Sequence, residues 1–212
     1  MPIPRSVHAY TLSCAALALL SCASPYQVVK LPEREADLYP LSQTRAQITI
    51  AIDEIANTER GWRYFGADLT REGILPVVVV VSNYGMDRVI VRPSDILAHR
   101  GAEIVDPVPI EAVIAIATKQ RRYLDSKTHE RVENYFRELA FRETVLMHAE
   151  TYQGVLFLPA QRHKSSSDSL FTMLNLFSES WLKVDVAVRD LERDNRLHFG
   201  PFSLPPIEDS PD

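Results

Sequence analysis

Cysteine is scarce in this chain, and its placement excludes several architectures. Only two cysteines are present, Cys14 and Cys22, and none follows residue 22. Residues 23–212 therefore cannot form a disulfide framework or a metal site built on thiolates. Their fold must rest on a hydrophobic core, for which the chain is long enough.

Glycine is also sparse, with seven residues in the chain, and the motifs that need glycine are missing. There is no dinucleotide-binding fingerprint, no P-loop and no Gly-x-Ser-x-Gly elbow. The segment from His129 to Glu133 begins like a zinc-protease helix but lacks the second histidine one turn later. Asp53, Glu54 and Asp68 could converge as catalytic carboxylates, although strand alternation and turns explain them as well. We therefore expect no enzyme activity, no metal and no cofactor.

A basic excess is absent as well. The chain has 23 Lys and Arg against 28 Asp and Glu, and it contains no basic tract, so nucleic acid is not an expected partner. Arg100, Lys119, Arg121 and Arg122 could form a small basic patch, although solvated charges on a surface are the more usual arrangement.

The N-terminus has the layout of a secretory signal. Arg5 precedes an apolar stretch over residues 11–20, which is far shorter than the roughly 20 residues that span a bilayer. The stretch ends in Leu19-Leu20-Ser21-Cys22 and resembles a bacterial lipoprotein signal. The resemblance implies cleavage after residue 21, acylation of Cys22 and a lipid anchor, and Ala23 after the cysteine implies the outer membrane, facing the periplasm. An ordinary cleaved signal with an incidental cysteine is the alternative.

Four regions follow from composition and periodicity. Residues 1–21 are the signal, and residues 22–43, with three prolines and clustered charges, are a flexible tether. Residues 44–206 are the folded domain, and residues 207–212 are an acidic tail. Strand patterns in the domain cover 46–53, 76–83, 88–92, 151–158, 181–189 and 197–204, with shorter candidates at 64–69 and 141–147.

Three local patterns refine this picture. The β-branched run from Pro76 to Val81 predicts a strand buried on both faces, and Gly200-Pro201 predicts a bulge or an edge strand. Residues 57–63 are expected to be a turn. Helical spacing over 109–124 and 129–139 predicts a two-helix insert at about 109–139. About seven short strands with intervening turns predict a mainly β, antiparallel sandwich.

The domain also resembles bacterial extracytoplasmic Ig-like lipoprotein domains. The residues that carry the resemblance are Phe65-Gly66-Ala67-Asp68-Leu69, Gly73 to Asn83, Glu150 to Phe157, and the strands 181–190 and 197–204. The resemblance implies an Ig-like sandwich in the cell envelope. It implies no catalytic or ligand-binding residue.

The expected function is a non-catalytic binding or scaffolding module, anchored to the membrane through Cys22 and contacting an envelope protein. Carriage of a small apolar ligand or lipid between helices and sheet is one alternative, and a hydrolase with a dispersed site is a more remote one. The apolar segment 170–177 is either a cap on the open end of the sandwich or an exposed surface. The residues proposed for an interaction surface are Tyr123, Tyr135, Phe136, Leu170, Phe171, Leu174 and Phe177.

Overall fold

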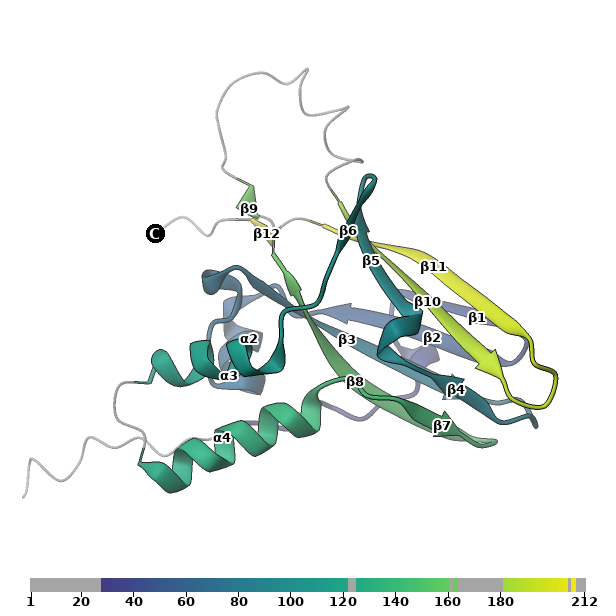
Figure 1. Ribbon diagram of the computed structural model, residues 1–212, viewed down its shortest axis with the longest axis horizontal. Coiled ribbons are helices and arrows are strands. Elements are labelled where there is room, and N and C mark those ends of the chain that lie inside the picture. Colours follow the sequence, from purple (N-terminus) through teal and green to yellow (C-terminus); the bar gives the residue numbers. More distant parts are fainter. Residues whose placement is uncertain (1–27, 122–124, 161, 164–180, 206, 209–212) are drawn as a thin grey trace, which may run out of the picture.

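The structure is a computed structural model that describes residues 28–121, 125–160, 162–163, 181–205 and 207–208. Two antiparallel sheets pack face to face (Figure 1). The first sheet has the order β1-β2-β3-β8, and its strands are β1 (Ser42–Arg45), β2 (Ile48–Glu54), β3 (Ile74–Asn83) and β8 (Glu150–Pro159).

The second sheet is built around β10 (Leu182–Asp190), which pairs with β11 (Arg196–Leu204) on one side. On the other side it pairs at one end with β5 and at the other end with β4, and these two strands are separated by a short 3₁₀ turn. The remaining elements here are β4 (Val89–Val91), η4 (Pro93–Asp95), β5 (Ile96–Arg100), β6 (Glu103–Val105) and β7 (Thr144–Leu146). β6 extends the sheet beside β5, and β7 extends it beside β4.

A separate two-residue parallel pair joins β9 (Arg162–His163) and β12 (Ile207–Glu208), so the expected tail begins as a short strand. Within the described residues the two sheets hold ten strands, against about seven expected. The mainly β, antiparallel sandwich with a helical insert is confirmed.

A helical layer covers the outer face of the first sheet. It contains α2 (Thr58–Phe65), α3 (Ile110–Lys119) and α4 (Ser126–Leu139). The insert predicted at 109–139 corresponds to α3 and α4. The first sheet thus lies between the second sheet and the helices, which explains why every residue of β3 is buried. Val77, Val79 and Val81 enter the core between the sheets, whereas Val78 and Val80 face the helices.

Helix α2 corrects two expectations, since residues 57–63 were expected to be a turn and 64–69 a short strand. The Asn57 side chain accepts hydrogen bonds from the N–H groups of Glu59 and Arg60 and so caps the first turn. Gly66 ends the helix in the left-handed conformation, with φ 62°. Asn57 and Gly66 are the sequence signals that could have located this helix.

The flexible tether expected for 22–43 is wrong for the part that the structure describes. Leu31, Ala36 and Tyr39 are buried against the helical side of the first sheet, and Ala36 begins the short helix η2 (Ala36–Leu38). The Ala36 N–H donates to Ser82 Oγ at 2.9 Å. Residues 42–45 then form β1, so residues 31–45 belong to the folded domain.

Candidate functional site

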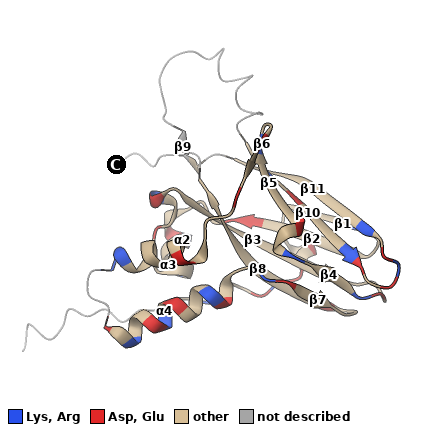
Figure 2. Cartoon of the chain, viewed as in Figure 1, with Lys and Arg blue, Asp and Glu red and all other residues tan. Residues whose placement is uncertain are grey.

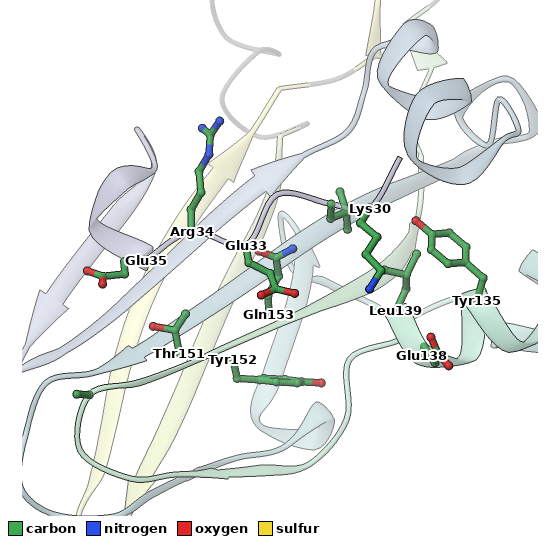
Figure 3. Close-up of a pocket in the computed structure, with 12 residues that line it drawn as sticks. Lys30, Glu33, Arg34, Glu35, Tyr135, Glu138, Leu139, Thr151, Tyr152 and Gln153 are labelled. Carbon is green, nitrogen blue, oxygen red and sulfur yellow. The ribbon is translucent and has the colours of Figure 1, made fainter. Parts of the chain in front are cut away.

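A groove lies where the N-terminal segment, the C-terminal half of α4 and the beginning of β8 meet (Figure 3). Its volume is about 670 Å³. It is lined by Lys30, Leu31, Glu33, Arg34, Glu35, Tyr135, Glu138, Leu139, Ala149, Thr151, Tyr152 and Gln153. The walls therefore come from the N-terminal segment at residues 30–35 and from residues 135–153, which follow it much later in the chain.

In this groove, the edge of β8 directs main-chain N–H and C=O groups away from the sheet, as the strand register shows. β8 is the last strand of its sheet. The carbonyls of Val155 and Phe157 accept the N–H groups of Phe141 and Val108, so these residues direct their main-chain groups away from β3. Main-chain groups alternate in direction along an antiparallel strand, and the pairing with β3 continues without a shift to Glu150. Thr151 and Gln153 therefore also point their N–H and C=O groups away from β3.

These outward groups have no partner among the described residues, whereas the rest of the edge is covered. Segments 107–108 and 140–141 shield β8 beyond Gly154. Thr151 is exposed and Gln153 is half-buried. The groove thus contains two main-chain donors and two acceptors in the spacing of a strand edge, and such groups normally find a partner.

Side-chain hydrogen bonds hold the N-terminal segment over the sheet and fix the shape of the groove. The Tyr39 hydroxyl donates to Gln153 Oε1 at 3.3 Å, and the hydroxyls of Ser82 and Thr151 are 2.8 Å apart. On the helical side, the Tyr135 hydroxyl donates to the main-chain carbonyl of Tyr64 at 2.7 Å. Burial, followed by the charge of Asp53, raises the pKa of Tyr39, which therefore stays protonated as a donor at neutral pH.

The charged side chains of the groove are of both signs. Lys30, Glu33 and Glu138 form no ion pair with another described residue, and Arg34 points away from the other side chains (Figure 3). Glu35 is engaged, because it accepts from the Tyr84 hydroxyl at 3.0 Å. Main-chain groups together with mixed charges suit a polar, extended ligand such as a polypeptide better than an apolar molecule.

Two residues of the interaction surface predicted from sequence, Tyr135 and Phe136, lie in the part of the chain that the structure describes. Tyr135 lines the groove. Phe136 is wrong as a surface residue: it is fully buried, with ring centroids 6.0 Å from Phe65 and 5.9 Å from Phe157. The remaining predicted residues, Cys22, Tyr123, Leu170, Phe171, Leu174 and Phe177, lie outside the described residues.

The alternative function, carriage of a small apolar ligand, needs space between the helices and the sheet. Phe65, Phe136 and Phe157 fill this interior, with all three pairs of ring centroids about 6 Å apart. At these rings the helices and sheet are in direct contact.

The candidate catalytic carboxylates stabilise local structure. Asp53 forms an ion pair with Arg60, with Oδ2 2.5 Å from Nη2. Asp68 accepts from the hydroxyls of Thr58 and Thr70 and from the Arg71 N–H. Burial alone would raise the pKa of Asp68, but these hydrogen bonds together outweigh it and hold the pKa below its ordinary value.

The histidine and the basic residues considered from the sequence lie in different parts of the fold. His129 lies beside a second cavity, between α3 and α4. In the ranges that the structure describes, no group of three or more His, Cys, Asp or Glu side chains could hold a metal ion. Lys119 and Arg121 of the expected basic patch lie near the end of α3, whereas Arg100 lies on β5 and donates to the Pro159 carbonyl at 3.5 Å. No helix in the described part of the chain has the length and hydropathy to cross a membrane.

The main-chain groups of Thr151 and Gln153 were not anticipated from the sequence. A sequence pattern identifies a strand but not the side on which a neighbour is missing. The only local signal was Gly154, whose position leaves no space for a side chain: a Cβ there would lie 2.8 Å from Phe141 Cα.

Comparison with models of known protein families and with curated proteins gives no match for this chain. Among solved structures, the chain is similar to a protein from Bacillus subtilis described as a "putative lipoprotein", with a TM-score of 0.41 and 10% sequence identity. The similarity covers 82% of this chain and 39% of the other, so this chain spans less than half the length of that protein. A similarity of this strength carries no argument about function, and the function is inferred from the residues described above.

Proposed function

We propose that this protein is a lipid-anchored module of the bacterial cell envelope that binds another protein without catalysing a reaction. The anchor is Cys22, acylated after removal of residues 1–21, and Ala23 directs the protein to the outer membrane, facing the periplasm. Several acyl chains, each contributing about 0.8 kcal/mol per buried CH₂, hold the domain at the membrane.

The observation that carries the proposal is the uncovered edge of β8 in the groove. The N–H and C=O groups of Thr151 and Gln153 pair with a short extended segment of the partner, about three residues long, which adds to the first sheet as a strand. Leu139 and Ala149, which line the groove, lie near the two ends of this stretch of edge. The covered edge beyond Gly154 limits the segment to a short one. Glu33, Glu138 and Lys30 contact the side chains that flank it.

The mutational test uses proline, which lacks the main-chain N–H and obstructs a pairing strand. In Thr151→Pro the lost N–H points away from β3, so the ladder within the sheet keeps its hydrogen bonds. Thr151→Ala is the matched control, because it keeps the N–H and removes the same hydrogen bond to Ser82. A photo-crosslinking residue at Glu138 reports on the groove in living cells, and the same residue at Leu97, which is exposed on the second sheet, is the control position.

The proposal predicts a discrete protein adduct at position 138 that persists in Thr151→Ala and is lost in Thr151→Pro, with none at position 97. An adduct that survives Thr151→Pro, or a protein that crosslinks only to lipid, would contradict it. Matching far-UV circular dichroism spectra of the two purified variants confirm that the comparison reports binding and not folding.

A further inference from the structure

The length of chain between the lipid anchor and the domain limits how far one end of α2 can lie from the membrane. The Val29 N–H donates to the main-chain carbonyl of Arg63 at 2.9 Å, so the chain is attached to α2 from residue 29. Cys22 precedes Val29 by seven residues, which reach about 25 Å when fully extended. With Cys22 acylated, as the proposed function requires, the C-terminal end of α2 must stay within this distance of the lipid.

The surface at that end of α2 carries an exposed tryptophan among basic residues. The Trp62 side chain is 44% exposed, and Val29 beside Arg63 is 49% exposed. The Arg121 guanidinium lies 5.9 Å from the Trp62 ring, and Lys119 and Arg71 line the same hollow as Trp62. We call Val29, Trp62, Arg63, Arg71, Lys119 and Arg121 the α2 face.

The charge of the α2 face differs from that of the whole protein. It holds four cations, Arg63, Arg71, Lys119 and Arg121, whereas the mature chain would have a net charge of −6, with 22 basic and 28 acidic residues. Acidic residues in the same region are Glu59 on α2 and Glu72 in the hollow, together with Asp68, whose carboxylate accepts hydrogen bonds from Thr58, Thr70 and the Arg71 N–H. Figure 2 shows Lys and Arg at the C-terminal end of α3, and Arg121, just beyond this end, donates to the Gly66 carbonyl at the end of α2 at 2.9 Å.

We propose that the α2 face lies on the headgroup layer of a membrane that contains anionic phospholipid, with Trp62 at the level of the headgroups. Tryptophan is enriched at this level because its ring is apolar and its N–H is polar. Each basic residue near an anionic surface strengthens the contact about fivefold. The face orients the anchored domain, and Lys30, which follows Val29 in the chain, lines the groove beside α4.

The chain offers a direct optical test, because it has two tryptophans, Trp62 and Trp181. Trp62 lies in the helical layer, and Trp181 precedes β10 in the sheet on the far side of the sandwich. The acylated mature protein is reconstituted into phosphatidylcholine vesicles with and without phosphatidylglycerol, and its fluorescence is quenched by lipids brominated near the headgroup.

The proposal predicts a quenchable fraction in the parent protein that disappears in Trp62→Phe and remains in Trp181→Phe. Quenching that persists in Trp62→Phe, or no quenching of acylated parent protein, would overturn it. The comparison of parent with Trp62→Phe is decisive even if Trp181→Phe does not fold. Failure of the proposed lipid anchor is distinguishable, since it appears as a protein without acyl mass that does not reconstitute.

Charge supplies a second readout with a matched control. Lys119→Glu should reduce Trp62 quenching severalfold in vesicles with phosphatidylglycerol, and added salt should reduce it in the parent. Lys183→Glu makes the same charge change on β10 of the second sheet and should leave quenching unchanged. Equal effects of the two substitutions would show that the orientation does not depend on the α2 face.

Discussion

A substitution at Phe136 tests whether this side chain of α4 lies in the hydrophobic core or on a binding surface. The structure places its fully buried ring in contact with both Phe65 and Phe157, with a third aromatic neighbour, Tyr135, whose ring centroid is 6.1 Å away. Phe136→Ala would leave a cavity where the helical layer meets the first sheet. The substitution should therefore act on stability before it acts on any partner.

The expected magnitude follows from this environment. Truncating a buried phenylalanine to alanine costs about 3–5 kcal/mol, through lost burial and the cavity left behind, and the lost ring contacts place this site toward the upper end. Because domains of this kind are stable by about 5–15 kcal/mol, a large part of the unfolding free energy would be lost. The melting temperature should fall by about 6–20 °C.

Urea unfolding followed by far-UV circular dichroism measures the effect. Tyr135→Phe is the control at the neighbouring position, because it keeps the ring and removes the hydroxyl that donates to the Tyr64 carbonyl, which should cost about 0.5–1.5 kcal/mol. An unfolding midpoint of Phe136→Ala equal to that of the parent would refute the placement of this ring in the core. It would return Phe136 to the surface that the sequence suggested.

Three further predictions concern packing and protonation. Gly154→Ala should lower the unfolding free energy by about 1–3 kcal/mol in urea, because its Cβ would lie 2.8 Å from Phe141; unchanged stability would show that the edge of β8 is looser than described. Asp68→Asn should cost about 1.5–3 kcal/mol at neutral pH. The pKa of Asp68 is lowered in the folded protein, so the stability that its carboxylate contributes is complete above the ordinary pKa of 3.8 and is lost as pH falls through the pKa of the folded state. The unfolding free energy of the parent should therefore decline more steeply in acid than that of Asp68→Asn. Parallel declines of the two unfolding free energies with pH would argue against this role of Asp68. Burial, followed by the hydrogen bond to Glu35, raises the pKa of Tyr84 to about 12, so absorbance titration should show a late-ionising tyrosine that is missing in Tyr84→Phe.

Some of the fold could be predicted because the controlling forces are local. The run Val77 to Val81 has no polar position, so it had to be buried on both faces, and the helices and the second sheet provide the two covers. The spacing of apolar residues predicts the two-helix insert at about 109–139. Gly200-Pro201 predicts a bulge or an edge strand. In the structure β11 is an edge strand, and its pairing with β10 shifts register between Val184 and Val186.

Other features depend on contacts that the local sequence does not encode. Helix α2 is short and strongly charged, and it is stabilised by its caps and by burial of Phe65. Residues 31–39 resembled a tether because four charged residues cluster there next to Pro32, yet Leu31, Ala36 and Tyr39 cover the sheet. The open main-chain groups of Thr151 and Gln153 depend on which strand lies beside β8, and only the three-dimensional arrangement determines that.

The mass of the mature protein extracted from membranes tests the central claim, a lipid-anchored domain, most directly. The account predicts a chain that begins at Cys22 and carries the mass of its acyl chains, and a Cys22→Ser protein that is released from the membrane or left as an unprocessed precursor. A mature chain with an unmodified Cys22, or full processing and unchanged membrane attachment of Cys22→Ser, would contradict it.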